Sequence, residues 1–320
     1  MLSYASRRLL LFVPTLFGVT VSIFVILRVI PGDVAEILAS ESGAETAATV
    51  KANVEAIRRE LRLDQPVITQ YVEWLRRFLV GDLGYSYWER RPVSEIVGER
   101  LPRTLELSVL TLALALVWAI PLGVVSAVRQ NHWIDYVVRC LSIVGMSLPL
   151  FLTGVLVLYV LTHFFRWMPP LDFREFSEAP LVNLQQLIWP AAAQAAYISA
   201  PISRLTRAQM LDVIREDYIR TARAKGVREL VITYSHAFRN ALLPVVTFVG
   251  WWGGRLLGGV VVMEIVFGVP GMGTTLVDAI NHRDYPTVQA IVLIMTLVFL
   301  GLNLLIDLVY GWLDPRIRYA

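Results

Sequence analysis

The sequence predicts an all-α protein that crosses a membrane with six helices, and composition, charge distribution and run length each point to this fold class. Hydrophobic residues make up 56% of the 320 residues and charged residues only 17%, whereas soluble domains carry about 25% charged residues. The mean hydropathy is +0.59. The sequence contains long runs with few or no charges, and these runs are long enough to cross a hydrocarbon core about 30 Å thick. In chain order, the predicted spans are Leu9–Leu27, Leu107–Val128, Leu141–Phe165, Leu187–Ile202, Pro244–Val262 and Ala290–Ile306.

The first span, within residues 1–30, has the positively charged start of a secretory signal peptide. Its uncharged run of nineteen residues is longer than the hydrophobic region of a typical signal peptide. The sequence after it, Arg28-Val-Ile-Pro-Gly-Asp, offers no small-x-small cleavage site. We therefore expect the span to be retained as an N-terminal transmembrane helix.

Residues 31–103 are expected to form an extracytoplasmic insertion after the first helix. Apolar residues recur at helical spacing on both sides of a turn at Asp64-Gln-Pro, and glycines interrupt the pattern after residue 80. Aromatic residues are typical both of protein interfaces and of membrane-surface belts. The module is thus either a cap over the helix bundle or a docking surface for a partner, and its aromatic residues are Tyr71, Trp74, Tyr85, Tyr87 and Trp88.

Residues 104–312 supply the other five spans, and residues 313–320 form a short tail. The fourth span is short and carries polar residues, and the fifth contains an arginine. Basic residues gather at the N-terminus, in the loops after the second and fourth spans and in the tail, while the short opposite loops are neutral or acidic. Because short basic loops stay in the cytoplasm and long loops cross regardless of charge, we expect both termini to be cytoplasmic.

The stretch Asp217–Gly226 is polar, basic and helical in pattern, and it lies between two apolar segments. Ile214, Tyr218 and Ala222 recur every four residues, so we expect them to share one helix face. Gly226 is the residue best able to end this helix in a left-handed conformation. A short amphipathic helix of this kind predicts a docking element for the groove of another protein.

Two motifs of this region are Arg-Thr-Ala-Arg-Ala-Lys-Gly at 220–226 and His-Ala-Phe-Arg-Asn-Ala-Leu-Leu-Pro at 236–244. They resemble the cytoplasmic coupling loop of ABC importer permeases, above all that of the dipeptide/oligopeptide/nickel permease family. Arg220 and Thr221 depart from the Glu and the first Ala of the general importer pattern. Further motifs resemble the same subgroup over nearly the whole chain: Leu63-Asp-Gln-Pro-Val, Gly81-Asp-Leu-Gly-Tyr-Ser, Phe267-Gly-Val-Pro-Gly-Met-Gly and Leu313-Asp-Pro-Arg-Ile-Arg-Tyr.

The resemblance implies the type I ABC importer permease fold, with a coupling loop over 207–240 that docks into a cleft of an ATPase subunit. The implied partners in the inner membrane complex are a homologous second permease, two ATPase subunits and an extracytoplasmic substrate-binding protein. The chain would form half of a translocation path for di- and oligopeptides, with nickel chelates, glutathione or oligosaccharides as alternatives. The implied coupling residues are Asp217, Tyr218, Thr221, Ala222, Arg223, Ala224, Lys225 and Gly226.

The fifth span combines a glycine repeat with a charge. Gly250, Gly254 and Gly258 recur at four-residue spacing, which predicts a helix-packing seam for the second or third span or for a sister permease. A guanidinium near the bilayer centre costs about 2.5–3.5 kcal/mol on insertion scales. Arg255 is therefore expected to face protein or water, either in the translocation path, where it meets a substrate carboxylate, or in an ion pair with another subunit. A third possibility is that the span boundary lies elsewhere.

Phe267–Gly273 cannot be a regular helix throughout, because it contains three glycines and a proline. It forms either a re-entrant lip of an external gate or an ordered turn before the amphipathic stretch Thr274–Asn281. Together with Arg255, the candidate path or gate residues are Glu264, Phe267, Pro270, Gly271 and Gly273.

The sequence does not indicate an enzyme or a metal site. A Gly-x-x-x-x-Gly-Lys-Ser/Thr phosphate loop is absent, so ATP and Mg are expected on the partner ATPase subunits, with no cofactor on this chain. The four histidines lack ligand spacing, and the single Cys140 is interpreted as a packing residue. A secondary transporter is the more distant alternative, and it would require several intramembrane carboxylates or histidines. In the sequence, only Glu264 and Asp307 meet this requirement, and both lie near span ends.

Overall fold

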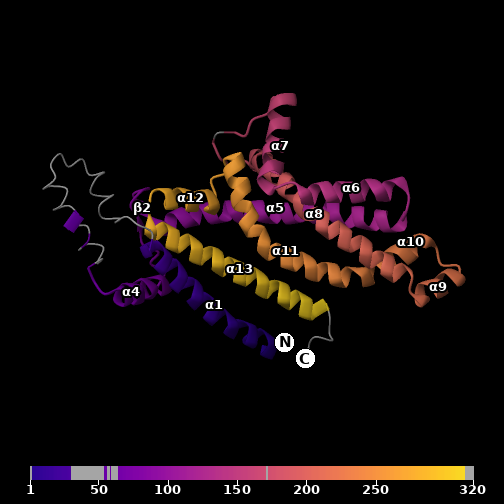
Figure 1. Cartoon of the computed structure of the whole chain (residues 1–320), viewed down its shortest axis with the longest axis horizontal. Coiled ribbons are helices and arrows are strands. Elements are labelled where there is room, and N and C mark those ends of the chain that lie inside the picture. The colour runs from indigo at the N-terminus through magenta and orange to yellow at the C-terminus, as the bar shows by residue number, and fades with distance from the viewer. Residues whose placement is uncertain (1, 30–53, 56–57, 59–63, 171, 314–320) are drawn as a thin grey trace. The chain divides into compact units, whose positions relative to one another are not determined.

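The computed structural model describes residues 2–29, 54–55, 58, 64–170 and 172–313, and most of them are helical (Figure 1). The predicted insertion is therefore described only in part, and the predicted tail lies outside the described residues except for Leu313. Two short strands, β1 (Tyr85–Ser86) and β2 (Arg91–Pro92), pair antiparallel. In chain order the elements are α1 Leu2–Val29, α4 Val67–Leu79, β1 Tyr85–Ser86, β2 Arg91–Pro92, α5 Val93–Val128, α6 Trp133–Ser147, α7 Leu150–Phe164, α8 Pro180–Ile214, α9 Asp217–Ala224, α10 Glu229–Val231, the π-helix η1 Ile232–Ala237, α11 Phe238–Phe267, α12 Met272–Asn281 and α13 Tyr285–Leu313.

Several of the described helices are long and apolar enough to cross a membrane. By length and composition these are Phe12–Val29, Val93–Val128, Glu229–Phe267 and Tyr285–Ile306, with α6 and α7 as a fifth span if they count together. The predicted fourth span lies inside α8, which has 35 residues but does not meet the same criteria of length and composition. Its polar side chains, including Asn183, Gln186 and Gln194, are buried in protein, so this helix needs fewer apolar residues than one that faces lipid.

The predicted third span, Leu141–Phe165, is wrong as a single helix. α6 and α7 are bent by 109° relative to each other, and the break falls at Leu148 and Pro149. Proline lacks the N–H group that a helix interior needs, and it disfavours helical conformation in the residue before it. Leu148 is accordingly extended, with φ −78° and ψ 131°.

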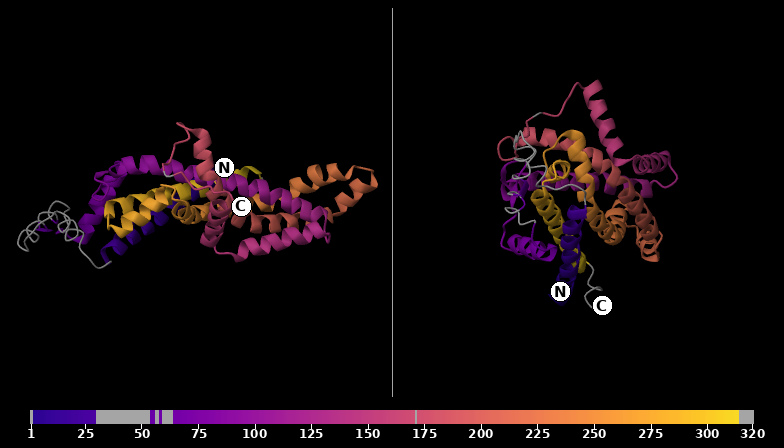
Figure 2. Two further views of the ribbon diagram at one scale, coloured as in Figure 1. Left: turned by 90° about the horizontal axis from the view of Figure 1, so that it is seen from above. Right: turned by 60° about the vertical axis from the view of Figure 1, so that its left-hand side comes forward.

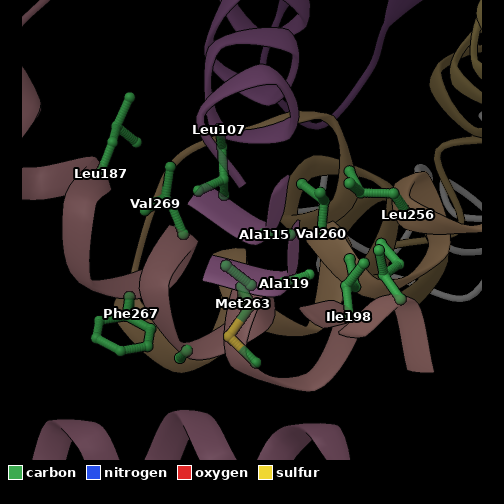
Figure 3. Close-up of a cluster of buried hydrophobic side chains, with 14 of the residues drawn as sticks. Leu107, Ala115, Ala119, Leu187, Ile198, Leu256, Val260, Met263, Phe267 and Val269 are labelled. Atoms are coloured by element: carbon green, nitrogen blue, oxygen red, sulfur yellow. The ribbon is translucent and has the colours of Figure 1, made fainter. Parts of the chain in front are cut away.

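The chain forms two compact units. The first comprises Met1–Ala5, Pro102–Thr274 and Gly301–Ala320, and the second comprises Ser6–Leu101 and Thr275–Leu300. The core of the first unit lies between α5, α8 and α11, where small residues allow close helix approach. Figure 3 shows Ala115 and Ala119 of α5 gathered with Val260 and Met263 of α11 and Ile198 of α8.

In the second unit, aromatic residues of the predicted insertion pack within the chain. Phe24 of α1 contacts the rings of Tyr71 and Trp74 in α4, at centroid distances of 5.2 and 5.8 Å. Trp88, between β1 and β2, stacks on His282 at 3.4 Å. Tyr71, Trp74 and Trp88 thus make contacts within the chain. This favours a role in a cap for these residues over a role in a free docking surface.

Candidate coupling site

The predicted coupling segment lies at one end of the first unit, where α8 leads into α9 and the chain returns through α10 and η1 to α11 (Figures 1 and 2). Only Arg215 and Glu216 separate α8 from α9, and the backbone of Glu216 is extended. Asp217 then lies in the first turn of α9, where the helix dipole favours a negative charge. The segment is thus a separate short helix set at a turn.

The face of α9 that packs against the rest of the chain differs from the face that the residue spacing predicts. Ile214 is the last residue of α8, so the prediction that it shares a helix face with Tyr218 and Ala222 is wrong. The extended Glu216 interrupts the helix, and a spacing counted across that break has the wrong phase. Ile219, which the sequence analysis missed, is fully buried, and Ala222 packs beside it, whereas Tyr218 is 43% exposed.

Ile219 anchors α9 in an apolar cluster that joins the ends of several helices. Fully burying an isoleucine side chain contributes about 1.5–3 kcal/mol. The chain therefore fixes the position of α9 with its own contacts. The buried members of the cluster come from α5, α8, α9, η1 and α11 and are Val124, Ala127, Met210, Ile219, Ile232, Ala237 and Ala241.

The end of α9 agrees with the prediction for Gly226, which has a φ of +76°. The Gly226 N–H donates to the Arg223 carbonyl at 2.9 Å, and the Val227 N–H donates to the Ala222 carbonyl at 3.2 Å. These two bonds form a Schellman motif, which satisfies carbonyls at the helix end. Open space surrounds the position of a Cβ on Gly226, so the backbone conformation requires glycine here.

The outward surface of α9 is polar. Asn240 of α11 donates to the Tyr218 hydroxyl at 2.8 Å, and Arg223 forms an ion pair with Glu229 at 2.8 Å. Ala222 is the one predicted coupling residue that is partly buried. The exposed ones are Asp217, Tyr218, Thr221, Arg223, Ala224, Lys225 and Gly226.

A buried ion pair that the sequence analysis missed holds α8 close to this site. Asp135, in the first turn of α6, is fully buried and accepts two hydrogen bonds from Arg207 of α8, both at 2.7 Å. The Ser126 hydroxyl and the Asn131 N–H donate to the same carboxylate, at 2.6 and 3.0 Å. The two charged residues are 72 positions apart, so their spacing gave no sign of the pair.

The predicted gate segment forms a tight corner between α11 and α12. Glu264 is fully buried, and its carboxylate accepts hydrogen bonds from the N–H groups of Gly273 and Thr274, at 2.7 and 3.1 Å. The first N–H groups of a helix have no partner within the helix, so this carboxylate satisfies the start of α12. The Thr104 hydroxyl of α5 donates to it as well, at 2.5 Å.

Gly271 and Gly273 leave the room that this carboxylate needs. A Cβ on Gly271 would overlap the carboxylate, and one on Gly273 would come within 2.7 Å of it. Phe267 belongs to the apolar core, and Pro270 lies in the turn. The irregular backbone predicted for this motif is confirmed for the residues between the end of α11 and the start of α12.

Arg255 lies on an exposed face of α11. Its guanidinium carbon is 4.7 Å from the centre of the Trp251 ring, a cation–π contact. Within the described part of the chain, the recorded ion pairs do not include Arg255. Arg255 therefore presents its positive charge on the surface of this chain, within a candidate membrane span.

The three glycines of the predicted seam have different surroundings. A Cβ on Gly250 would overlap Ile306 of α13, whereas Gly258 has no neighbour within 4 Å of that position. Gly254 is buried. Residues four apart drift by about 40° around a helix, so the repeat winds away from a single neighbour. Close packing within this chain occurs at Gly250, against the last span.

Two family comparisons match this chain. Residues 119–319 match the family described as binding-protein-dependent transport system inner membrane component. Residues 1–108 match the N-terminal region of membrane components of binding-protein-dependent transport systems. Together the two matches cover nearly all of the sequence.

Individual proteins are similar over the full length. The glutathione transport system permease protein GsiC of Pectobacterium atrosepticum is 40% identical over 319 residues, covering 100% of both chains. The GsiC protein of Escherichia coli K12 is 38% identical with the same coverage. The dipeptide transport system permease protein DppB of Alkalihalophilus pseudofirmus is 35% identical over 340 residues, again covering 100% of both chains.

A solved structure shares the fold. It is described as the crystal structure of an amino acid ABC transporter with histidines, and it superimposes with a TM-score of 0.55 over 68% of this chain and 94% of its own. The sequence identity is 15%, so this likeness concerns the fold alone. It agrees with the predicted fold class.

Proposed function

The chain belongs to the family of binding-protein-dependent transport system inner membrane components, and we propose that within such a system it forms half of a peptide translocation path. It is a multi-pass permease of the inner membrane. The proposed partners are a homologous second permease, two ATPase subunits that bind ATP and Mg, and an extracytoplasmic binding protein. In this proposal the chain carries no cofactor and catalyses no reaction.

The observation that carries the coupling role is the exposed polar face of α9 on a fixed base. Ile219 and the Schellman end at Gly226 hold the helix, while its outer residues are exposed. A docking helix must be rigid enough to transmit force, and its contact surface must be free. We assign ATPase docking to this outer face, with Ala222 as part of its internal support.

Substitution of Ala224 tests this assignment. Ala224 is exposed on α9, so Ala224→Trp should leave folding unchanged and obstruct an ATPase cleft. Ala208→Trp makes the same change at an exposed position of α8 and is the matched control. The measurements are co-purified ATPase and ATP-dependent uptake. Wild-type values for both in the α9 variant would refute the docking assignment.

The proposed orientation places both termini and α9 in the cytoplasm. In a Cys140→Ser background, a cysteine at position 176 should react with an impermeant reagent from outside. One at position 223 should react only after permeabilisation. The opposite labelling pattern would reverse the orientation and remove the coupling role.

Short peptides are the proposed cargo. Full-length relatives are named as glutathione and dipeptide permeases, and glutathione is itself a tripeptide with free carboxylates. Arg255 supports this choice, because an accessible guanidinium on α11 can meet a carboxylate in the path. We propose that Glu264, Phe267, Gly271 and Gly273 act indirectly, by holding the corner at Pro270 that borders the external gate.

The cargo proposal is tested with a peptide and its C-terminally amidated form in proteoliposomes that contain the complete transporter. Arg255→Ala should lower uptake of the free acid more than that of the amide and leave the yield of the complex unchanged. Arg255→Lys, which keeps the charge, should lose less. If both substrates lose uptake equally and the yield falls, Arg255 is a structural residue.

A further inference from the structure

A pocket of about 450 Å³ lies between α9 and the ends of α5 and α8. Arg215, Arg220 and Arg223 line it, and Glu229 is the one acidic residue among the described residues of its lining. The lining therefore carries a net charge of about +2 at neutral pH. A pocket with this charge is suited to an anion.

Two of the three guanidinium groups have most of their donors free for a ligand. Arg223 is neutralised by Glu229, with bonds of 2.8 and 3.4 Å. Arg215 reaches the Gln130 side chain at 3.4 Å, and Arg220 reaches the exposed Asp217 at 3.4 Å. Bonds of this length are weak, and exposed pairs of this kind contribute about 0–1 kcal/mol. Arg215 and Arg220 are thus the groups available for an anion.

The pocket lies at the end of a candidate membrane span. Val128 is the last residue of that span in α5 and lines the pocket, and the polar sequence from Arg129 onward follows directly. Leu211 and Ile214 add apolar walls from the end of α8. A soluble anion makes no use of apolar walls, whereas a phospholipid presents its phosphate and the first carbons of its chains together. Basic pockets between membrane helices are known to bind anionic head groups.

We propose that this pocket binds the phosphate of an anionic phospholipid, with phosphatidylglycerol as the test ligand. Arg215 and Arg220 donate hydrogen bonds to the phosphate oxygens, and Leu211, Ile214 and Val128 contact the glycerol and upper acyl carbons. Arg220 belongs to α9, so the bound lipid ties this helix to the membrane surface. The inference goes beyond the proposed function and rests on it only for the choice of leaflet.

The test counts lipids retained by the complete transporter after reconstitution in an equimolar mixture of phosphatidylglycerol and phosphatidylethanolamine, by native mass spectrometry. The variant is Arg215→Gln with Arg220→Gln. Each basic group near an anionic surface changes affinity about fivefold, so the affinity for phosphatidylglycerol should fall about twenty-five-fold. Arg215→Lys with Arg220→Lys should retain most of the binding, because the charges remain.

The matched control is Arg228→Gln with Arg239→Gln, which removes the same charge from exposed positions of the same loop outside the pocket. It should retain phosphatidylglycerol like the wild type. Equal retention by the pocket variant and the wild type overturns the proposal. So does stabilisation of the lipid-free detergent complex by inorganic phosphate alone, which would mark a soluble-anion site. Loss of ATPase subunits from the pocket variant, with lipid retention unchanged, would make the pocket an ATPase contact. Lipid retention is measured without transport. Failure of the lipid proposal can therefore be distinguished from failure of the coupling assignment.

Discussion

Two corners of the first unit depend on glycine for different reasons. At the exposed end of α9, Gly226 supplies a positive φ and has open space around it. At the buried corner between α11 and α12, Gly271 and Gly273 supply space for the Glu264 carboxylate. The exposed corner is limited by backbone conformation and leaves its outer surface free for a partner. The buried corner is limited by volume, so any added side chain there displaces a hydrogen-bonded group.

The largest effect is expected from the buried carboxylate of Asp135, which stabilises the same end of the unit as α9. Asp135→Asn should lower the free energy of unfolding by about 3–5 kcal/mol, because it leaves Arg207 without its buried partner. The surface pair Arg91–Glu99 is the control, and Glu99→Gln should cost less than about 1 kcal/mol. Thermal unfolding of the purified complex measures both. Similar losses for the two variants would contradict the burial argument.

The volume argument predicts an intermediate effect at the buried corner. Gly271→Ala should cost about 1–3 kcal/mol, because the new methyl group overlaps the Glu264 carboxylate and forces the corner to shift. Gly98→Ala is the control, since no atom lies within 4 Å of its Cβ position in α5, and it should be neutral or stabilising. A neutral Gly271→Ala variant would show that the corner has spare room.

The smallest of the three effects is expected at the exposed corner. Gly226→Ala should cost about 1–2 kcal/mol, the price of a left-handed conformation for a residue with a Cβ. Gly226→Asn should cost less, because asparagine tolerates this conformation better. The midpoints of thermal unfolding should therefore rank glycine above asparagine above alanine. Equal midpoints for asparagine and alanine would indicate that the backbone changes conformation.

The sequence predicted features that depend on local chemistry. A glycine after a basic helix identified the end of α9, and three glycines with a proline identified the irregular corner after Phe267. Features set by distant contacts were missed: the Asp135–Arg207 ion pair joins residues 72 positions apart, and Thr104 donates to Glu264, 160 positions away. Two local backbone breaks were missed as well, and the one at Glu216 sets the inward face of α9. The bend at Pro149 lies within an uncharged run, where hydropathy gives no boundary.

The short link between α8 and α9 has a mechanical consequence. The N–H groups of Arg215 and Glu216 both bond back to carbonyls in the last turn of α8, so the link has no slack. At 1.5 Å per residue, the 35-residue helix α8 is about 52 Å long. The ion pair of Arg207 with Asp135 lies about 10 Å from the α9 end and joins α8 to α6. In the proposed coupling role, the link passes a displacement of α9 directly to α8, and this ion pair passes it on to α6.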